Sequence, residues 1–152
     1  MEIYKCNIII LTFIITGTWD LLLLLLTHNY DKLPKFIQWF DFIKSLKPYY
    51  ERHTILSAFL LAAFIGAVTQ YIILMLHKLP TNKESLLTFL ILSFIVSALI
   101  GIPMQYSNLF PILDDTYYKY LGTYRGLYHD GISGLIVQIT LLCILYGYKY
   151  IK

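Results

Sequence analysis

The sequence predicts an all-α integral membrane protein, a four-helix bundle with an interfacial amphipathic helix between its first and second spans. The 152-residue chain is 58% apolar and only 14% charged, and its mean hydropathy is +0.65. This is far more apolar than an ordinary soluble domain. Four apolar stretches also approach the length of ~20 residues that a spanning helix needs. We therefore expect one membrane domain, residues 1–152.

The four predicted spans follow one another along the chain, which places both termini on the same side of the membrane. They cover residues 7–27, 54–76, 86–105 and 131–148. The first stretch is too long for a signal-peptide core and no small-x-small cleavage pattern follows it, so it indicates an uncleaved anchor. Lysines and arginines are divided almost evenly between the two sides, which leaves the orientation open.

The first loop contains a helical pattern over residues 33–46. Apolar residues recur there at helical spacing with polar residues between them. Pro34 suits a first helical turn, and Pro48 predicts a stop just beyond the helix end. A helix with Trp39 and several lysines either lies in the membrane interface or packs on the protein's own spans, and both interpretations stay open.

Asp20 is the one acidic residue in the middle of a predicted span, and it lies between Trp19 and a run of leucines. Hydrocarbon solvates no lone charge, so this carboxyl must be protonated and hydrogen-bonded, paired with a cation, or reached by water. Thr16 and Thr18 are candidate hydrogen-bond partners, together with the intramembrane glutamines. The candidate cations precede the fourth span and are Arg125 and His129.

The second and third spans share an internal similarity between residues 58–70 and 93–105. Each stretch has a small residue at every fourth position, and these are Ala58, Ala62 and Gly66, then Ser93, Ser97 and Gly101. Stripes of this kind let helix backbones approach closely in a membrane. A tight polar turn at residues 81–85 joins the two spans, so we expect them to pack against each other.

Both stripes end in a glutamine, and the fourth span repeats this ending. The Gly-x-x-x-Gln endings place Gln70, Gln105 and Gln138 inside apolar helices, the last of them following Gly134. Together with Asp20 they predict a polar seam of interhelical hydrogen bonds. The alternatives are a path for an ion or substrate, which in so short a chain would need a dimer, and coincidence in apolar sequence.

The third loop, residues 106–130, holds the densest reactive groups. His129, Asp130 and Arg125 are candidate catalytic residues for acid–base chemistry on a lipid headgroup. With His28 and Asp31, which follow the first span, His129 and Asp130 make a candidate metal set of poor spacing. In the alternative, Asp114 or Asp115 caps a short helix and His129-Asp130 caps the start of the fourth span. We expect no cofactor.

Tyrosines and cysteines have simpler interpretations. Most of the 14 tyrosines lie at predicted span borders, where they indicate an aromatic belt, and Tyr49 and Tyr50 belong to this group. Cys6 and Cys143 are expected to be two unpaired thiols. The net charge of +3 is scattered among loops, so nucleic acid is not an expected partner.

A family resemblance rests on Thr16-Gly-Thr-Trp-Asp20 and on residues 126–138, Gly-Leu-Tyr-His-Asp-Gly-Ile-Ser-Gly-Leu-Ile-Val-Gln. These stretches resemble small multi-pass membrane proteins encoded by nucleocytoplasmic large DNA viruses. The resemblance implies a virion or host membrane location, with other membrane or capsid proteins or a second copy as partners besides the lipid bilayer.

The sequence is compatible with three functions. They are a structural or interaction protein, a small transporter or channel with a path through Asp20 and the glutamines, and a lipid-acting enzyme at the His28, Asp31, His129 and Asp130 face. The sequence favours the first over an enzyme.

Overall fold

The structure is a computed structural model that describes residues 2–38, 41–51, 53–106 and 123–151. Every regular element in these ranges is helical, which confirms the predicted all-α class for them. The elements are α1 (Glu2–His28), the 3-10 helix η1 (Tyr30–Lys32), α2 (Lys35–Gln38), α3 (Asp41–Tyr50), α4 (Ile55–Leu76), α5 (Lys83–Tyr106) and α7 (Thr123–Ile151).

Four of the described helices are long and apolar enough to cross a membrane. The qualifying windows are Tyr4–His28, Ile55–Leu76, Lys83–Ile100 and Leu127–Gly147, and each overlaps one predicted span. The helices α1 and α7 begin earlier than predicted, at Glu2 and Thr123. A helix satisfies its own backbone beyond the apolar stretch, so hydropathy marks the apolar part rather than the helix end.

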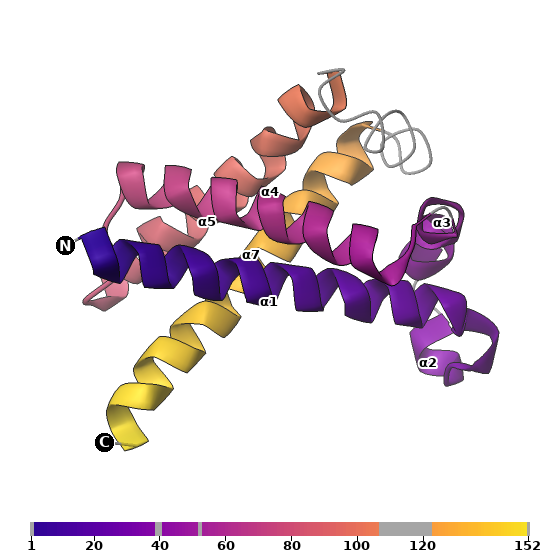
Figure 1. Cartoon of the computed structure of the whole chain (residues 1–152), viewed down its shortest axis with the longest axis horizontal. Coiled ribbons are helices and arrows are strands. Elements are labelled where there is room, and N and C mark those ends of the chain that lie inside the picture. Colours follow the sequence, from indigo (N-terminus) through magenta and orange to yellow (C-terminus); the bar gives the residue numbers. More distant parts are fainter. Residues whose placement is uncertain (1, 39–40, 52, 107–122, 152) are drawn as a thin grey trace.

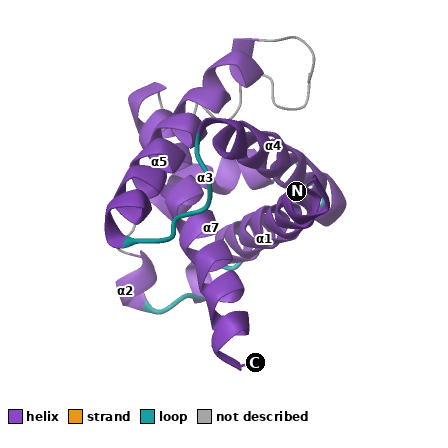
Figure 2. Cartoon of the chain, turned by 90° about the vertical axis from the view of Figure 1, so that its left-hand side faces the viewer, coloured by secondary structure: helices purple, strands orange, loops and turns teal. Residues whose placement is uncertain are grey.

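The long helices form two pairs. α1 lies along α4, and α5 lies along α7, while α4 and α5 contact each other much less. Figure 1 shows the first pair running across the view and the second pair crossing it obliquely. Figure 2, seen nearly along α1 and α4, shows the same division. The expectation that the second and third spans pack tightly is therefore wrong.

Close approach within each pair occurs at a glycine. A Cβ atom added to Gly66 of α4 would collide with Thr16 of α1, and one added to Gly134 of α7 would collide with Ser97 of α5. The small stripes thus do admit a neighbouring backbone, but the neighbour is α1 or α7 rather than the other stripe. Small residues permit an approach without specifying the partner.

The internal similarity between the second and third spans is also seen in how they pack on their partner helices. Phe59 and Phe94 occupy equivalent places in the two similar stretches. Each ring covers a glycine of the paired helix, and an added Cβ atom at Gly17 or Gly131 would lie 2.5 Å from the ring of Phe59 or Phe94, respectively. Of the other stripe residues, Ala58 and Ser93 are buried, Ala62 is half-buried, and the surroundings of Gly101 are outside the described part.

The first loop folds into α2 and α3 instead of one helix over residues 33–46. α3 continues through Pro48 to Tyr50, so the predicted stop at Pro48 is wrong. Ile43, Leu46 and Tyr50 share one face and are buried, and α3 packs against α1. For α3, the interpretation that it packs on the protein's own spans is the one that the structure supports.

Candidate functional site

Asp20 is bonded to a tyrosine from the first loop. The Tyr50 hydroxyl of α3 donates to Asp20 Oδ1 at 2.6 Å. The side chain of Tyr50 is 1% exposed and belongs to an apolar cluster with Leu23, Leu24, Leu46 and Ala58, against which Trp19 packs. A short bond inside an apolar cluster holds the end of α3 against the middle of α1.

The backbone of Tyr50 joins the same region to the start of α4. Its carbonyl oxygen accepts a hydrogen bond from the His53 backbone N–H at 3.1 Å, and His28 Nε2 of α1 lies 3.4 Å from the same oxygen. Thr54 and Ser57 then form a capping box that begins α4. Three chain segments therefore meet around one residue.

His53 is buried at this meeting point, with 8% of its surface exposed. Its Nδ1 lies 3.5 Å from Ser57 Oγ. Desolvation lowers the pKa of His53 below its ordinary value of 6.5, because burial penalises the charged imidazolium. Burial therefore favours the neutral form of the ring at this position.

A second polar contact joins the two helix pairs. Gln138 Nε2 of α7 donates to Gln70 Oε1 of α4 at 2.5 Å, and the two side chains are only 2% and 0% exposed. The remaining amide atoms, Gln70 Nε2 and Gln138 Oε1, are buried without a hydrogen-bond partner among the described residues. The side chain of Gln105, the third predicted glutamine, lies outside the described part.

The hydroxyl groups inside the helices do not join this seam. They donate to carbonyl oxygens of their own helix at 2.7 or 2.8 Å, as seen for Thr12, Thr16, Thr18, Thr69, Ser93 and Thr140. The predicted bonds from Thr16 and Thr18 to Asp20 are therefore wrong. A hydroxyl on the β-carbon already reaches the carbonyl four residues earlier, which satisfies it locally.

Trp19, the residue before Asp20, has a buried polar atom that makes no hydrogen bond to a described residue. This atom is the indole Nε1. An unpaired buried donor costs about 1–3 kcal/mol. This cost offsets part of the stability that the region gains from packing of the Trp19 ring on the apolar cluster.

The four candidate metal residues, which the structure describes, do not gather at one place. His129 Nδ1 lies 3.8 Å from Asp130 Oδ1, and His129 Nε2 lies 3.3 Å from Ser133 Oγ. Asp31 instead faces Lys47, with 4.0 Å between Oδ2 and Nζ. In the described part of the chain, no group of three or more His, Cys, Asp or Glu side chains is placed to hold a metal ion.

Of the other third-loop predictions, the structure tests the one for His129 and Asp130. His129 and Asp130 lie within α7, which starts at Thr123, so their predicted role as the cap of the fourth span is wrong. Arg125 is on the same helix, but its side chain lies outside the described part. Asp114 and Asp115 also lie outside it.

Sequence reasoning missed Tyr50 as the partner of Asp20 because Pro48 was expected to end the helix. The signal was nevertheless present. Tyr50 lies seven residues after Ile43 and four after Leu46, so it continues the apolar face if the helix passes through Pro48. Both cysteines, in contrast, are free as expected, and both are exposed.

Comparison with known proteins assigns no role to these residues. The Asp20–Tyr50 and Gln70–Gln138 contacts join helices, and the candidate metal set is dispersed. No family model, no curated protein and no solved structure matches this chain.

Proposed function

We propose that the chain is a structural, multi-pass membrane protein whose spans hold the α2–α3 segment in place as an interaction surface. The observation that carries this proposal is the use of the polar side chains within the apolar helices. Asp20 is bonded to Tyr50 and Gln70 to Gln138, so these groups fasten one helix to another. Polar residues in membrane helices commonly act in this way.

The segment that the Asp20–Tyr50 contact holds at its α3 end has the chemistry of a docking surface. Lys35 and Lys44 are exposed on it, as is Lys32 in the preceding η1, and Phe36 of α2 is 68% exposed. A neighbouring protein with an acidic surface and an apolar pocket would complement these side chains. Two acidic residues in the described part flank this segment: Asp31, which faces Lys47, and Glu51, which is exposed directly after α3.

Membrane insertion is the first part of the proposal to test. Membranes from cells that express the chain with a different tag at each end should retain it after alkaline carbonate washing. Protease added to sealed vesicles should remove both tags or neither, because four crossings return the chain to its starting side. Release by carbonate, or removal of a single tag, would contradict the four-span arrangement.

The interaction role has a separate test. Photo-crosslinking amino acids at positions 35 and 36 should capture a specific neighbour in the native membrane, and a crosslinker at position 87 on the apolar side of α5 serves as the control. Tyr50→Phe should reduce capture from positions 35 and 36, because it releases the end of α3. Equal capture in the variant would show that the tether does not present this surface.

The family resemblance adds a location to the proposal. The neighbours would be membrane or capsid proteins of a virus with an internal membrane. Fractionation of purified virions should then recover the chain with the membrane layer and the crosslinked neighbour with the capsid or the membrane. Absence of the chain from purified virions would remove this part and leave the structural role in place.

A transporter is the second candidate function, and one observation favours it. Gln70 Nε2 and Gln138 Oε1 offer a buried donor and acceptor without partners in the described part, as a polar path would require. Vesicles containing the purified protein should then show ion or solute flux that Gln70→Leu abolishes. If flux is absent, or indifferent to this change, the glutamines are structural.

A further inference from the structure

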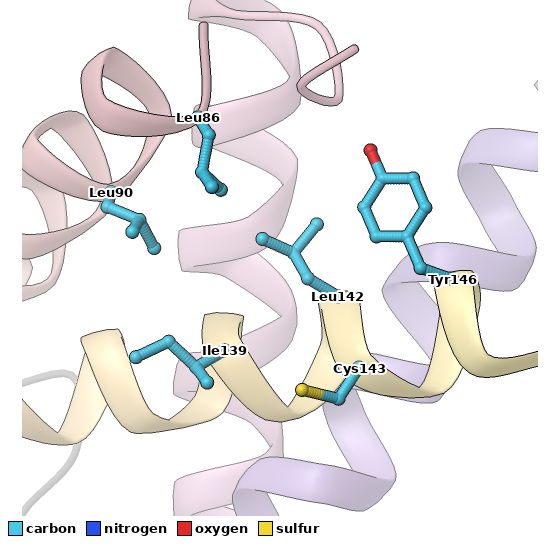
Figure 3. Close-up of a pocket in the computed structure, with 6 residues that line it drawn as sticks. All are labelled: Leu86, Leu90, Ile139, Leu142, Cys143 and Tyr146. Carbon is cyan, nitrogen blue, oxygen red and sulfur yellow. The ribbon is translucent and has the colours of Figure 1, made fainter. Parts of the chain in front are cut away.

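An apolar groove lies on the outer side of the α5–α7 pair. It has a volume of about 290 Å³ and is lined by Leu86 and Leu90 from α5 and by Ile139, Leu142, Cys143 and Tyr146 from α7. Figure 3 shows the α7 side chains along one side and the two leucines facing them from α5. A water molecule occupies only ~30 Å³ of liquid, so the groove has room for a chain segment.

The lining excludes a polar occupant. Its side chains are hydrocarbon except for the Cys143 thiol and the Tyr146 hydroxyl. That hydroxyl donates to the carbonyl oxygen of Pro80 in the turn between α4 and α5. All six residues lie within the apolar windows of α5 and α7. In a bilayer, the groove opens to lipid, and an alkyl chain matches it in shape and polarity.

Charge at one end of the groove selects the kind of lipid. Lys83 is exposed and precedes Leu86 and Leu90 by three and seven residues, so the three share one face of α5. Glu84 is rotated about 100° from that face. Lys78 is also exposed, in the turn before α5. An ammonium group at the helix end reaches the headgroup level, where it attracts a phosphate.

We propose that this groove binds one anionic phospholipid, with an acyl chain along Leu86, Leu90, Ile139 and Leu142 and its phosphate beside Lys83. The inference rests on the proposed membrane location. It adds a lipid-binding site to the structural role. The bound lipid fills the space between α5 and α7 and thereby supports that pair.

Lipid titration of the purified full-length protein in a mild detergent tests the proposal. Native mass spectrometry with phosphatidylglycerol and phosphatidylcholine of equal chain length should detect one bound phosphatidylglycerol. Lys83→Gln should weaken its binding about fivefold, as expected for one basic residue near an anionic lipid. Glu84→Gln is the matched control and should not weaken it. Equal binding of the two lipids by the unaltered protein would overturn the headgroup assignment.

Filling the groove tests the acyl-chain site. Ile139→Trp should weaken binding of both lipids at least about tenfold, a loss of roughly 1.4 kcal/mol. Leu87→Trp, on an exposed part of α5 outside the groove, should leave it unchanged. Retention of lipid by the Ile139 variant would place the lipid elsewhere and overturn the proposal.

Thiol alkylation provides a measurement without groove substitutions. Phosphatidylglycerol should slow the reaction of Cys143 with N-ethylmaleimide, but not that of Cys6, which is exposed on α1 and does not line the groove. Equal rates at Cys143 with and without the lipid would overturn the proposal. Carbonate extraction distinguishes failure of the lipid site from failure of the proposed membrane location. A protein that stays in the membrane but binds no lipid would contradict only the lipid site.

Discussion

Tyr50 makes one hydrogen bond to a residue distant in sequence and another to a residue close to it. Its hydroxyl bonds Asp20 on α1, and its carbonyl oxygen accepts from the backbone of His53. The first contact fixes a side chain thirty positions away in sequence, and the second starts the turn into α4. One residue thereby sets both the position of α3 and the entry of the second span.

The Asp20–Tyr50 bond predicts an asymmetric pair of substitutions. Tyr50→Phe leaves the Asp20 carboxyl buried without its donor, so it should lower the free energy of unfolding by about 1–3 kcal/mol. Asp20→Asn keeps an acceptor oxygen and should cost less. Thermal unfolding in detergent measures both. In the double variant the effects should not add, and strict additivity would show that the two side chains are not coupled.

His53 predicts a pH dependence of stability. Desolvation lowers its folded-state pKa below 6.5, so between these two values the unfolded chain binds more protons than the folded one. His53 should not affect stability well above pH 6.5; stability should fall as the pH drops through that value and level off below the folded-state pKa. His53→Gln should show a shallower decline over this range. Identical slopes would mean that His53 has the same pKa in the folded and the unfolded chain.

At the residue scale, the sequence identified Asp20 but not its partner. A carboxyl in an apolar run is recognisable from composition alone. Its partner depends on where α3 ends, and Pro48 argued for an end that burial of Tyr50 overrides. The loss of one backbone hydrogen bond at a proline is a local cost, whereas the position of Tyr50 reflects contacts with another helix.

Helix pairing depends on whether a neighbouring backbone can enter at a glycine. Gly66 and Gly134 lie on different pairs, and both face a hydroxyl-bearing side chain of the partner helix. In a membrane, where lipid removes the hydrophobic force between helices, such close packing would contribute much of the association energy. The α4 and α7 helices are therefore sensitive to single methyl groups at these positions.

Alanine substitutions test this packing. Gly66→Ala and Gly134→Ala should each lower stability by about 1–3 kcal/mol through overpacking. Gly147→Ala is the matched control, because an added Cβ atom there meets nothing within 4 Å and gains helix propensity. Ser97→Gly should restore part of the loss caused by Gly134→Ala. A control variant as unstable as the other two would indicate a general intolerance of glycine replacement.

The sequence predicted the long helices better than it predicted which helices pack together. Length and hydropathy predict each long helix, because these are the two properties that a spanning helix needs. The same stripes of Ala58, Gly66, Ser93 and Ser97 are compatible with several partners, and the tight turn at residues 81–85 favoured the wrong one. What distinguishes α1 and α7 as partners is the fit of Phe59 over Gly17 and of Phe94 over Gly131, which no single-helix pattern contains.

The whole molecule consists of two helix pairs that a buried amide contact links. Gln70 and Gln138 belong to different pairs, α1–α4 and α5–α7. Their contact joins α4 to α7, and α1 also touches α7. The polar seam expected from the Gly-x-x-x-Gln endings therefore includes these two glutamines, and it connects units rather than neighbouring spans.

Replacement of the glutamines tests this link. Gln70→Leu should destabilise the protein by about 1–3 kcal/mol, since it leaves the buried Gln138 amide without its partner. The double variant Gln70→Leu, Gln138→Leu should recover most of that stability, because an apolar pair of similar volume has no unpaired group. Thermal unfolding provides the comparison. If the double variant is less stable than either single variant, the amide contact itself holds the two pairs together.

The pairing of the long helices determines the order in which the protein can be assembled. α1 pairs with the span that follows it, and α5 pairs with the span that follows it. The α1–α4 pair and the Asp20–Tyr50 bond beside it use only residues that precede α5 at Lys83, so both can form before α5 is synthesised. The Gln70–Gln138 bond needs α7 and can form only after the second pair has been made.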